Sequence, residues 1–147
     1  LEVPALAEQL DVLAPKLSFL SIGTNDLTQF LFAADRANPK LAERYDWLSP
    51  AILRFLKRVM HSVAGHNVDV TVCGEMGGRR LEALALLGIG IRRLSITPAS
   101  VGPIKELIRK VDLEEIGAAM NQWLSAPPRD LRAALVTWAQ ERGIDCD

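Results

Sequence analysis

The sequence predicts an α/β fold in which parallel strands alternate with helices. Three short apolar, β-branched runs have the length and composition of strands, at residues 17–22, 68–73 and 93–97. Each run ends at a glycine or a proline, and a helical pattern lies after it. Strands that alternate with helices form parallel sheets joined by right-handed crossovers. We therefore expect helices either to cover a parallel sheet or to surround a sheet that closes into a barrel.

The spacing of apolar residues places the helices. Ser49 and Pro50 are typical of an N-cap and a first turn, and apolar residues then recur at i, i+3, i+4 and i+7 as far as Val63. This pattern predicts a helix with one buried face. Residues 1–3 are interpreted as the end of an earlier strand. The other predicted helices cover residues 4–13, 80–87, 100–110, 113–124 and 130–142.

Size and composition limit the function classes. The chain has 147 residues, enough for one domain with a core, and a net charge of −1. This charge gives no signal for nucleic acid or for an anionic membrane, and no apolar run is long enough to span a bilayer. We expect no nucleic-acid or membrane partner. The two cysteines, Cys73 and Cys146, favour a reduced cytoplasmic setting over a disulfide framework.

Polar side chains gather where the predicted strands end. Glu2 follows the truncated first strand, the triplet 24–26 follows the strand ending at Ile22, and Cys73 begins a second polar triplet at residues 73–75. In parallel α/β folds, functional residues cluster at the carboxyl ends of strands. The residues alone also allow a plainer interpretation, in which these triplets make turns and the first of them caps a helix.

The residue types suit one kind of chemistry. Glu2 and Asp26 are hard oxygen ligands, and Mg²⁺ is usually held by one or two carboxylates with substrate oxygens and water. Asn25 carries an amide that can bind a phosphate or carboxylate, and the guanidinium of Arg36 matches phosphate oxygens. Cys73 can move a proton. The set suits an anionic, metal-bound substrate whose reaction moves one proton.

Three motifs closely resemble signatures of the phosphoenolpyruvate (PEP)-utilising enzymes: residues 21–29 (SIGTNDLTQ), Asp35–Arg36, and residues 73–78 (CGEMGG). Residues 1–4 match a further segment upstream, so the resemblance runs from residue 1 to about residue 110. Within that superfamily the chain is most similar to Enzyme I of the phosphotransferase system, the PEP–protein phosphotransferase. Residues 48–53 and 94–100 fit Enzyme I better than pyruvate phosphate dikinase or PEP synthase, and residues 94–105 resemble its nitrogen-related branch.

The resemblance implies a fold and a set of roles. Residues 1–111 would form the C-terminal half of a PEP-binding (β/α)8 barrel of the TIM type, and the helices of residues 112–147 would pack on the barrel or on a dimer partner. Glu2 and Asp26 would bind Mg²⁺, and Asn25, Asp26 and Arg36 would bind PEP. After the phosphoryl group has passed to a histidine on a separate domain, Cys73 would protonate the enolate to give pyruvate.

The resemblance also implies partners and limits. A barrel of this type needs about 250 residues and eight strands, and the family's other substrate-binding arginines lie on strands that this chain lacks. We therefore expect the chain by itself to be inactive. The implied partners are PEP, a histidine-phosphorylatable carrier protein of the phosphotransferase system, and a second copy in a homodimer. The alternatives are a non-catalytic PEP-binding or dimerisation module, and a relative of the dikinase or the synthase.

Overall fold

A three-stranded parallel sheet lies at the centre of the computed structural model, which describes residues 1–146. The strands are β1 (Phe19–Gly23), β2 (Asp69–Cys73) and β3 (Leu94–Ser95), in the order β1-β2-β3. The β1–β2 register runs from Phe19 opposite Asp69 to Gly23 opposite Cys73. The predicted α/β fold with parallel strands is confirmed, although these residues do not by themselves close a barrel.

Leu1 extends the sheet at the outer edge of β1. Its N-terminal ammonium group donates a hydrogen bond to the Ser21 carbonyl, and the Gly23 amide donates one to the Leu1 carbonyl at 3.0 Å. This is the hydrogen-bond pattern of parallel strands, with Leu1 opposite Ile22. The pairing agrees with the interpretation of residues 1–3 as the end of a strand, although no strand is assigned there.

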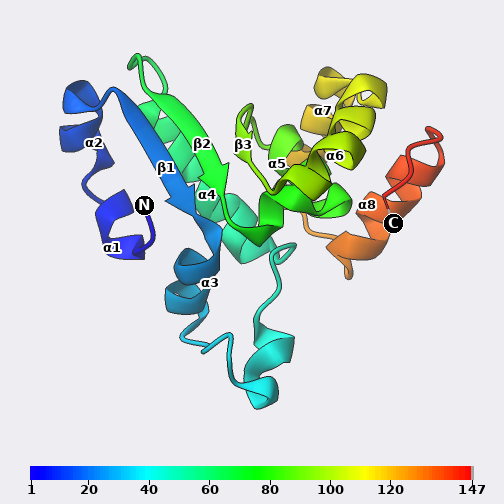
Figure 1. The fold of residues 1–147 in the computed structure, drawn as a ribbon, viewed down its shortest axis with the longest axis horizontal. Coiled ribbons are helices and arrows are strands. Elements are labelled where there is room, and N and C mark those ends of the chain that lie inside the picture. The colour runs from blue at the N-terminus through cyan, green and yellow to red at the C-terminus, as the bar shows by residue number, and fades with distance from the viewer. Residues whose placement is uncertain (147) are drawn as a thin grey trace.

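Helices flank the sheet and lie beyond its carboxyl end (Figure 1). Three 3₁₀ segments lie between them, at Ala14–Lys16, Pro39–Arg44 and Glu75–Gly78. The α-helices of the described residues are α1 (Pro4–Ala7), α2 (Leu10–Leu13), α3 (Thr24–Phe32), α4 (Pro50–Val63), α5 (Arg80–Gly88), α6 (Pro98–Lys110), α7 (Leu113–Ser125) and α8 (Leu131–Gln140).

Three predicted elements differ from the observed ones. The single helix predicted for residues 4–13 is wrong: α1 and α2 are separate, because Gln9 leaves the helical region at φ −112° and ψ 3°. The strand predicted for residues 93–97 shortens to β3, since only Leu94 and Ser95 pair with β2. The helix predicted from residue 100 begins at Pro98, a residue favoured in the first turn of a helix.

The core lies between the sheet and the helices behind it. The buried face predicted for α4 is confirmed, since Ile52, Leu53 and Leu56 are fully buried and Val63 nearly so. Helix α5 is buried along almost its whole length and packs against α7 and α8. The two C-terminal helices, α7 and α8, therefore pack against the preceding part of this chain. No helix of residues 1–146 has the length and apolar composition needed to cross a membrane.

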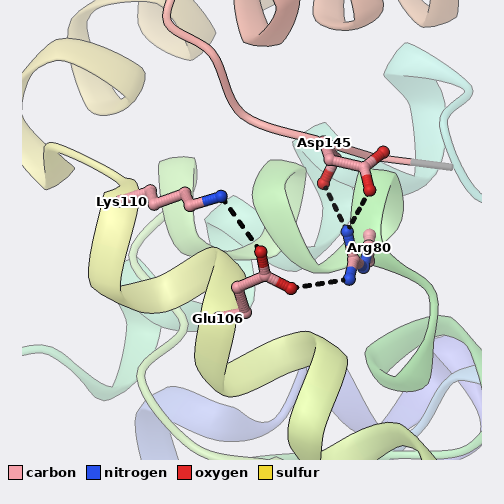
Figure 2. A network of polar contacts seen from close by, with 4 residues as sticks. All are labelled: Arg80, Glu106, Lys110 and Asp145. Atoms are coloured by element: carbon pink, nitrogen blue, oxygen red, sulfur yellow. Dashed lines mark hydrogen bonds and ion pairs between the residues drawn. The ribbon is translucent and has the colours of Figure 1, made fainter.

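Ion pairs and hydrogen bonds attach the C-terminal residues to the helices. Arg80, at the start of α5, donates to the Asp145 carboxylate at 2.7 Å and to its carbonyl at 3.1 Å. The same guanidinium binds Glu106 of α6 at 3.0 Å, and Glu106 also accepts from Lys110 at 3.0 Å (Figure 2). We call these four residues the Arg80 cluster. It joins the last residues to α5 and α6.

Candidate functional site at the carboxyl end of the sheet

Helix α3 begins immediately where β1 ends (Figure 1), and its first residue contacts the end of β2. The Thr24 hydroxyl donates a hydrogen bond to the Cys73 carbonyl at 3.1 Å. Gly23 occupies the N-cap position and offers no side chain there, so the interpretation that residues 24–26 cap a helix is wrong in detail. Instead, Thr24 joins the two strand ends, and the next two residues project from the first turn of α3.

Gly74 lets the second motif approach the first one closely. Its φ of 106° lies in the region that glycine adopts readily and other residues rarely do. A Cβ atom at this position would lie 2.8 Å from Thr24 Oγ1 and 3.3 Å from Asn25 Oδ1. A larger residue would therefore both strain the backbone and push the α3 turn away from β2.

Asn25 lines two neighbouring hollows. One, of about 350 Å³, we call the loop hollow; its walls also include Arg36, Tyr45, Trp47, Arg79 and Arg132. The other, of about 670 Å³, we call the strand-end hollow; its walls also include Cys73, Glu75, Arg79, Ser95 and Thr97. The Oδ1 atom of Asn25 is buried and has no hydrogen-bond partner among the described residues. A buried acceptor without a partner is costly, so this amide oxygen is available to a hydrogen-bond donor.

Cys73 is the last residue of β2, and its side chain is half-buried. Its sulfur lies 3.4 Å from the Ser21 hydroxyl, which donates to it, and 3.4 Å from the Ile22 carbonyl, to which the thiol donates. Both partners belong to β1. The sulfur is thus held between the two strand ends at the wall of the strand-end hollow.

Asp26 and Arg36 form an exposed ion pair beside Asn25. Asp26 Oδ1 and Arg36 Nη2 are 3.7 Å apart, and the side chains are 40% and 46% exposed. The Arg36 backbone amide is held by the Gln29 side chain at 3.2 Å. Exposed pairs of this kind contribute only about 0–1 kcal/mol. An anionic ligand can therefore recruit the guanidinium at small cost.

The Glu2 side chain lies against Gly23, the last residue of β1. A Cβ atom on Gly23 would lie 2.6 Å from Glu2 Oε1. Among residues 1–146 no group of three or more acidic, histidine or cysteine side chains could hold a metal by itself. Glu2 and Asp26 supply two carboxylates near one strand end, which fits Mg²⁺ if substrate oxygens and water complete its shell.

Sequence reasoning missed several residues that line these hollows, among them Tyr45, Trp47, Arg79 and Arg132. The Tyr45 hydroxyl donates to the Asn25 backbone carbonyl. Its ring meets the Trp47 ring edge to face, with centroids 5.7 Å apart, and the Arg79 guanidinium lies 5.6 Å from the Trp47 ring centre. Arg79 directly follows the motif at residues 73–78, which is the one signal that could have drawn attention to it.

Burial raises the pKa of Tyr45 above its usual 10.0. The charge of Arg36 and a contact with Trp47 lower this pKa, whereas the charges of Asp26 and Glu75 raise it. The contact with Trp47 falls short of hydrogen-bond geometry, since the Trp47 ring nitrogen has no hydrogen-bond partner within the described part of the chain. Tyr45 is therefore a neutral hydrogen-bond donor at neutral pH.

Comparison with known proteins agrees with this geometry. The family described as "PEP-utilising enzyme, PEP-binding domain" matches residues 1–113. The chain belongs to this family of PEP-binding domains. The match ends at the first residue of α7, so α7 and α8 lie beyond it. The boundary predicted between residues 111 and 112 lies close to this point but stays a prediction.

Relatives of this PEP-binding domain confirm the resemblance to Enzyme I. A phosphoenolpyruvate-protein phosphotransferase of Borreliella burgdorferi is 43% identical over 86% of this chain and 22% of its own length. A protein of Salmonella typhimurium named for the phosphoenolpyruvate-dependent phosphotransferase system is 37% identical over 98% of this chain and 19% of its own length. A multiphosphoryl transfer protein of Xanthomonas campestris is 45% identical over 92% of this chain and 16% of its own length. The chain thus spans about a fifth of the length of these relatives.

Proposed function

We propose that this PEP-binding domain is part of a PEP–protein phosphotransferase, in which its sheet forms the C-terminal half of a (β/α)8 barrel. The names of its relatives favour this activity over that of a dikinase or synthase. The parallel strands, with polar residues gathered at their carboxyl ends, support the barrel, since sites in such barrels lie at that end. The other strands and the phosphorylated histidine would belong to the rest of the protein.

One observation carries the proposal: Asn25 lines both hollows, one shared with Arg36 and the other with Cys73. A ligand bound to the Asn25 amide can therefore extend its anionic part toward Arg36 and its carbon skeleton toward Cys73. PEP has this shape, with a phosphate at one end and a carbon that must be protonated at the other. A Cβ atom at position 74 would lie 3.3 Å from Asn25 Oδ1, so glycine there keeps the amide from being displaced.

The residues would act by positioning and by neutralising charge, as expected for phosphoryl transfer. Asn25 and Arg36 would hold the substrate oxygens, and Glu2 and Asp26 would hold Mg²⁺, which supplies positive charge beside the phosphate. When the phosphoryl group leaves for a histidine, an enolate remains. The Cys73 S–H bond then breaks, a C–H bond forms on the enolate carbon, and pyruvate and a thiolate result.

The test is Cys73→Ala in the intact protein that contains this chain. General acid catalysis contributes about 10²- to 10⁴-fold to a rate, so we expect pyruvate formation to fall by about 10²-fold or more. PEP binding, measured by calorimetry in the presence of Mg²⁺, should change little, because Cys73 holds no substrate oxygen in the proposal.

The matched control is Cys146→Ala, since the other cysteine comes after α8 and lines neither hollow. It should leave both readouts unchanged. An equal loss of pyruvate formation and of PEP binding in Cys73→Ala would remove the proton-donor role. A non-catalytic module predicts no PEP-dependent phosphoryl transfer even in the unchanged intact protein.

We extend the proposal to the setting of the protein. The acceptor would be a histidine-bearing carrier of the phosphotransferase system, the location cytoplasmic, and the intact protein a homodimer. The nitrogen-related branch, suggested by residues 94–105, stays a prediction. The chain alone lacks the remaining strands of the proposed barrel and is expected to be inactive.

A further inference from the structure

Tyr45, in the segment between α3 and α4, contacts the backbone of Asn25 in the proposed substrate site. The Tyr45 hydroxyl donates its proton to the Asn25 carbonyl, in the first turn of α3. Asn25 is the residue whose amide lines both hollows. The position of that amide therefore depends on a side chain that lies outside every motif found in the sequence.

Tyr45 is packed from behind by its neighbour Trp47. The Trp47 ring is only 8% exposed and meets Tyr45 edge to face. Arg79, which follows the second motif, covers the Trp47 ring. The ring of Tyr45 is thus held against a buried aromatic side chain, which limits the directions in which its hydroxyl can point.

Arg132 of α8 binds the segment that contains Tyr45 and Trp47 through Asp46. Its Nη2 atom donates to Asp46 Oδ1 at 3.0 Å, and its Nη1 atom donates to Glu82 Oε1 at 3.1 Å. The Glu82 side chain is 3% exposed, so one end of the bridge is anchored in the core. Asp46 lies between Tyr45 and Trp47 in the chain and also accepts from the Leu48 amide at 3.0 Å.

We propose that Tyr45 and Arg132 are positioning residues for Asn25: Arg132 holds the segment through Asp46, and Tyr45 sets the first turn of α3 through the Asn25 carbonyl. This inference rests on the proposed function, since it takes Asn25 as a substrate-binding residue. Neither side chain needs to touch PEP. A displacement of about 1 Å in a positioning contact can cost as much as 10²-fold in rate, and the loss of one hydrogen bond to the Asn25 backbone is expected to have a smaller effect that falls on substrate binding.

The decisive variant is Tyr45→Phe in the intact protein, because it removes one hydroxyl and keeps the ring. A single hydrogen bond contributes about 1 kcal/mol, so we expect KM for PEP to rise about fivefold. The value of kcat should change by less than about twofold, as for a loss that affects ground state and transition state alike. Thermal midpoints measured on the same samples show whether folding is intact.

A double-variant cycle separates positioning from a purely structural role. Once Asn25→Ala has removed the amide, the added change Tyr45→Phe should raise KM no further, because there is no amide left to position. Arg132→Lys, which keeps the charge but loses the two-pronged geometry, should also raise KM. The matched control is Arg80→Lys in the Arg80 cluster, which binds two carboxylates away from both hollows and should leave KM unchanged.

The outcomes are distinguishable. If the unchanged intact protein transfers no phosphoryl group from PEP, the proposed function fails. If it is active but Tyr45→Phe keeps the original KM, only the positioning inference fails. A fivefold rise that persists in the Asn25→Ala background would likewise overturn positioning through Asn25, and equal KM changes in Arg132→Lys and Arg80→Lys would overturn the role of Arg132.

Discussion

Arg132 and Arg80 each bind two carboxylates from different parts of the chain, but their surroundings differ. Arg132 joins Asp46 to Glu82, whose side chain is 3% exposed. Arg80 joins Glu106 to Asp145, whose side chains are 51% and 62% exposed (Figure 2). One arginine therefore neutralises a buried charge, and the other binds charges that water already solvates.

The difference teaches which ion pairs matter for folding. A buried carboxylate that loses its partner stays desolvated, whereas an exposed one regains water and is screened by salt. Glu106 would also keep a partner without Arg80, because the hydrogen bond and charge of Lys110 are the largest causes that lower the pKa of Glu106. We therefore expect Arg132 to stabilise the fold strongly and Arg80 to order only the end of the chain.

The largest expected effect tests the buried side of this comparison. Arg132→Ala should lower the free energy of unfolding by about 2 kcal/mol, between the values for an exposed and a fully buried pair, because Glu82 is buried but Arg132 is 45% exposed and Arg79 still lies 3.7 Å from Glu82. Denaturant unfolding of the chain measures this change. Adding Glu82→Met should recover most of the loss, since no buried charge then remains. A loss below about 1 kcal/mol would mean that Glu82 does not depend on Arg132.

A smaller effect is expected at the exposed side. Arg80→Gln should shift the thermal midpoint by less than about 2 °C, because both partner carboxylates are more than half exposed and regain water when the arginine is lost. Amide hydrogen exchange should nevertheless quicken at Ile144, whose amide bonds the Ala139 carbonyl at the end of α8. A midpoint shift as large as that of Arg132→Ala would erase the distinction between the two arginines.

The smallest effect concerns the pH dependence of the segment that Arg132 holds. Tyr45 is the only tyrosine, so tyrosinate absorbance reports this residue alone. Burial raises its pKa in the folded chain, so its contribution to stability is complete below pH 10.0 and is lost as the pH rises through the folded pKa. We expect the pKa to fall toward 10.0 in Arg132→Ala and to stay raised in Arg80→Gln. The idea fails if the folded and denatured chains titrate together.

Sequence patterns predicted the fold where periodicity was strong. Helix α4 was predicted because apolar spacing near 3.6 residues continues over the whole element, and strands β1 and β2 because their apolar runs have the length and composition of strands. Residues 4–13 show enough apolar residues for one helix, but only Leu10 among them is buried, with Ala7 partly packed against the core, so packing does not hold a continuous helix together. Strand β3 was overestimated because pairing, which a single run does not reveal, sets its length.

The proposed site was predictable to the extent that it follows strand ends. Asn25 and Cys73 line the same hollow because the carboxyl ends of parallel strands meet at one edge. The bridge between Asp46 and Arg132 was not predictable, since its residues are 86 positions apart and neither lies in a motif. Contacts of that kind depend on how α8 packs on α5, which no local pattern encodes.

On the edge of β1 that does not pair with β2, Leu1 forms backbone hydrogen bonds only with Ser21 and Gly23, near the end of the strand. At the start of this strand Phe19 is 69% exposed, and Val12 of α2 is 61% exposed. An exposed strand edge beside apolar side chains favours strand pairing between molecules. Solutions of the separate chain should therefore self-associate as the concentration rises, and the measurements of stability described above belong in dilute samples.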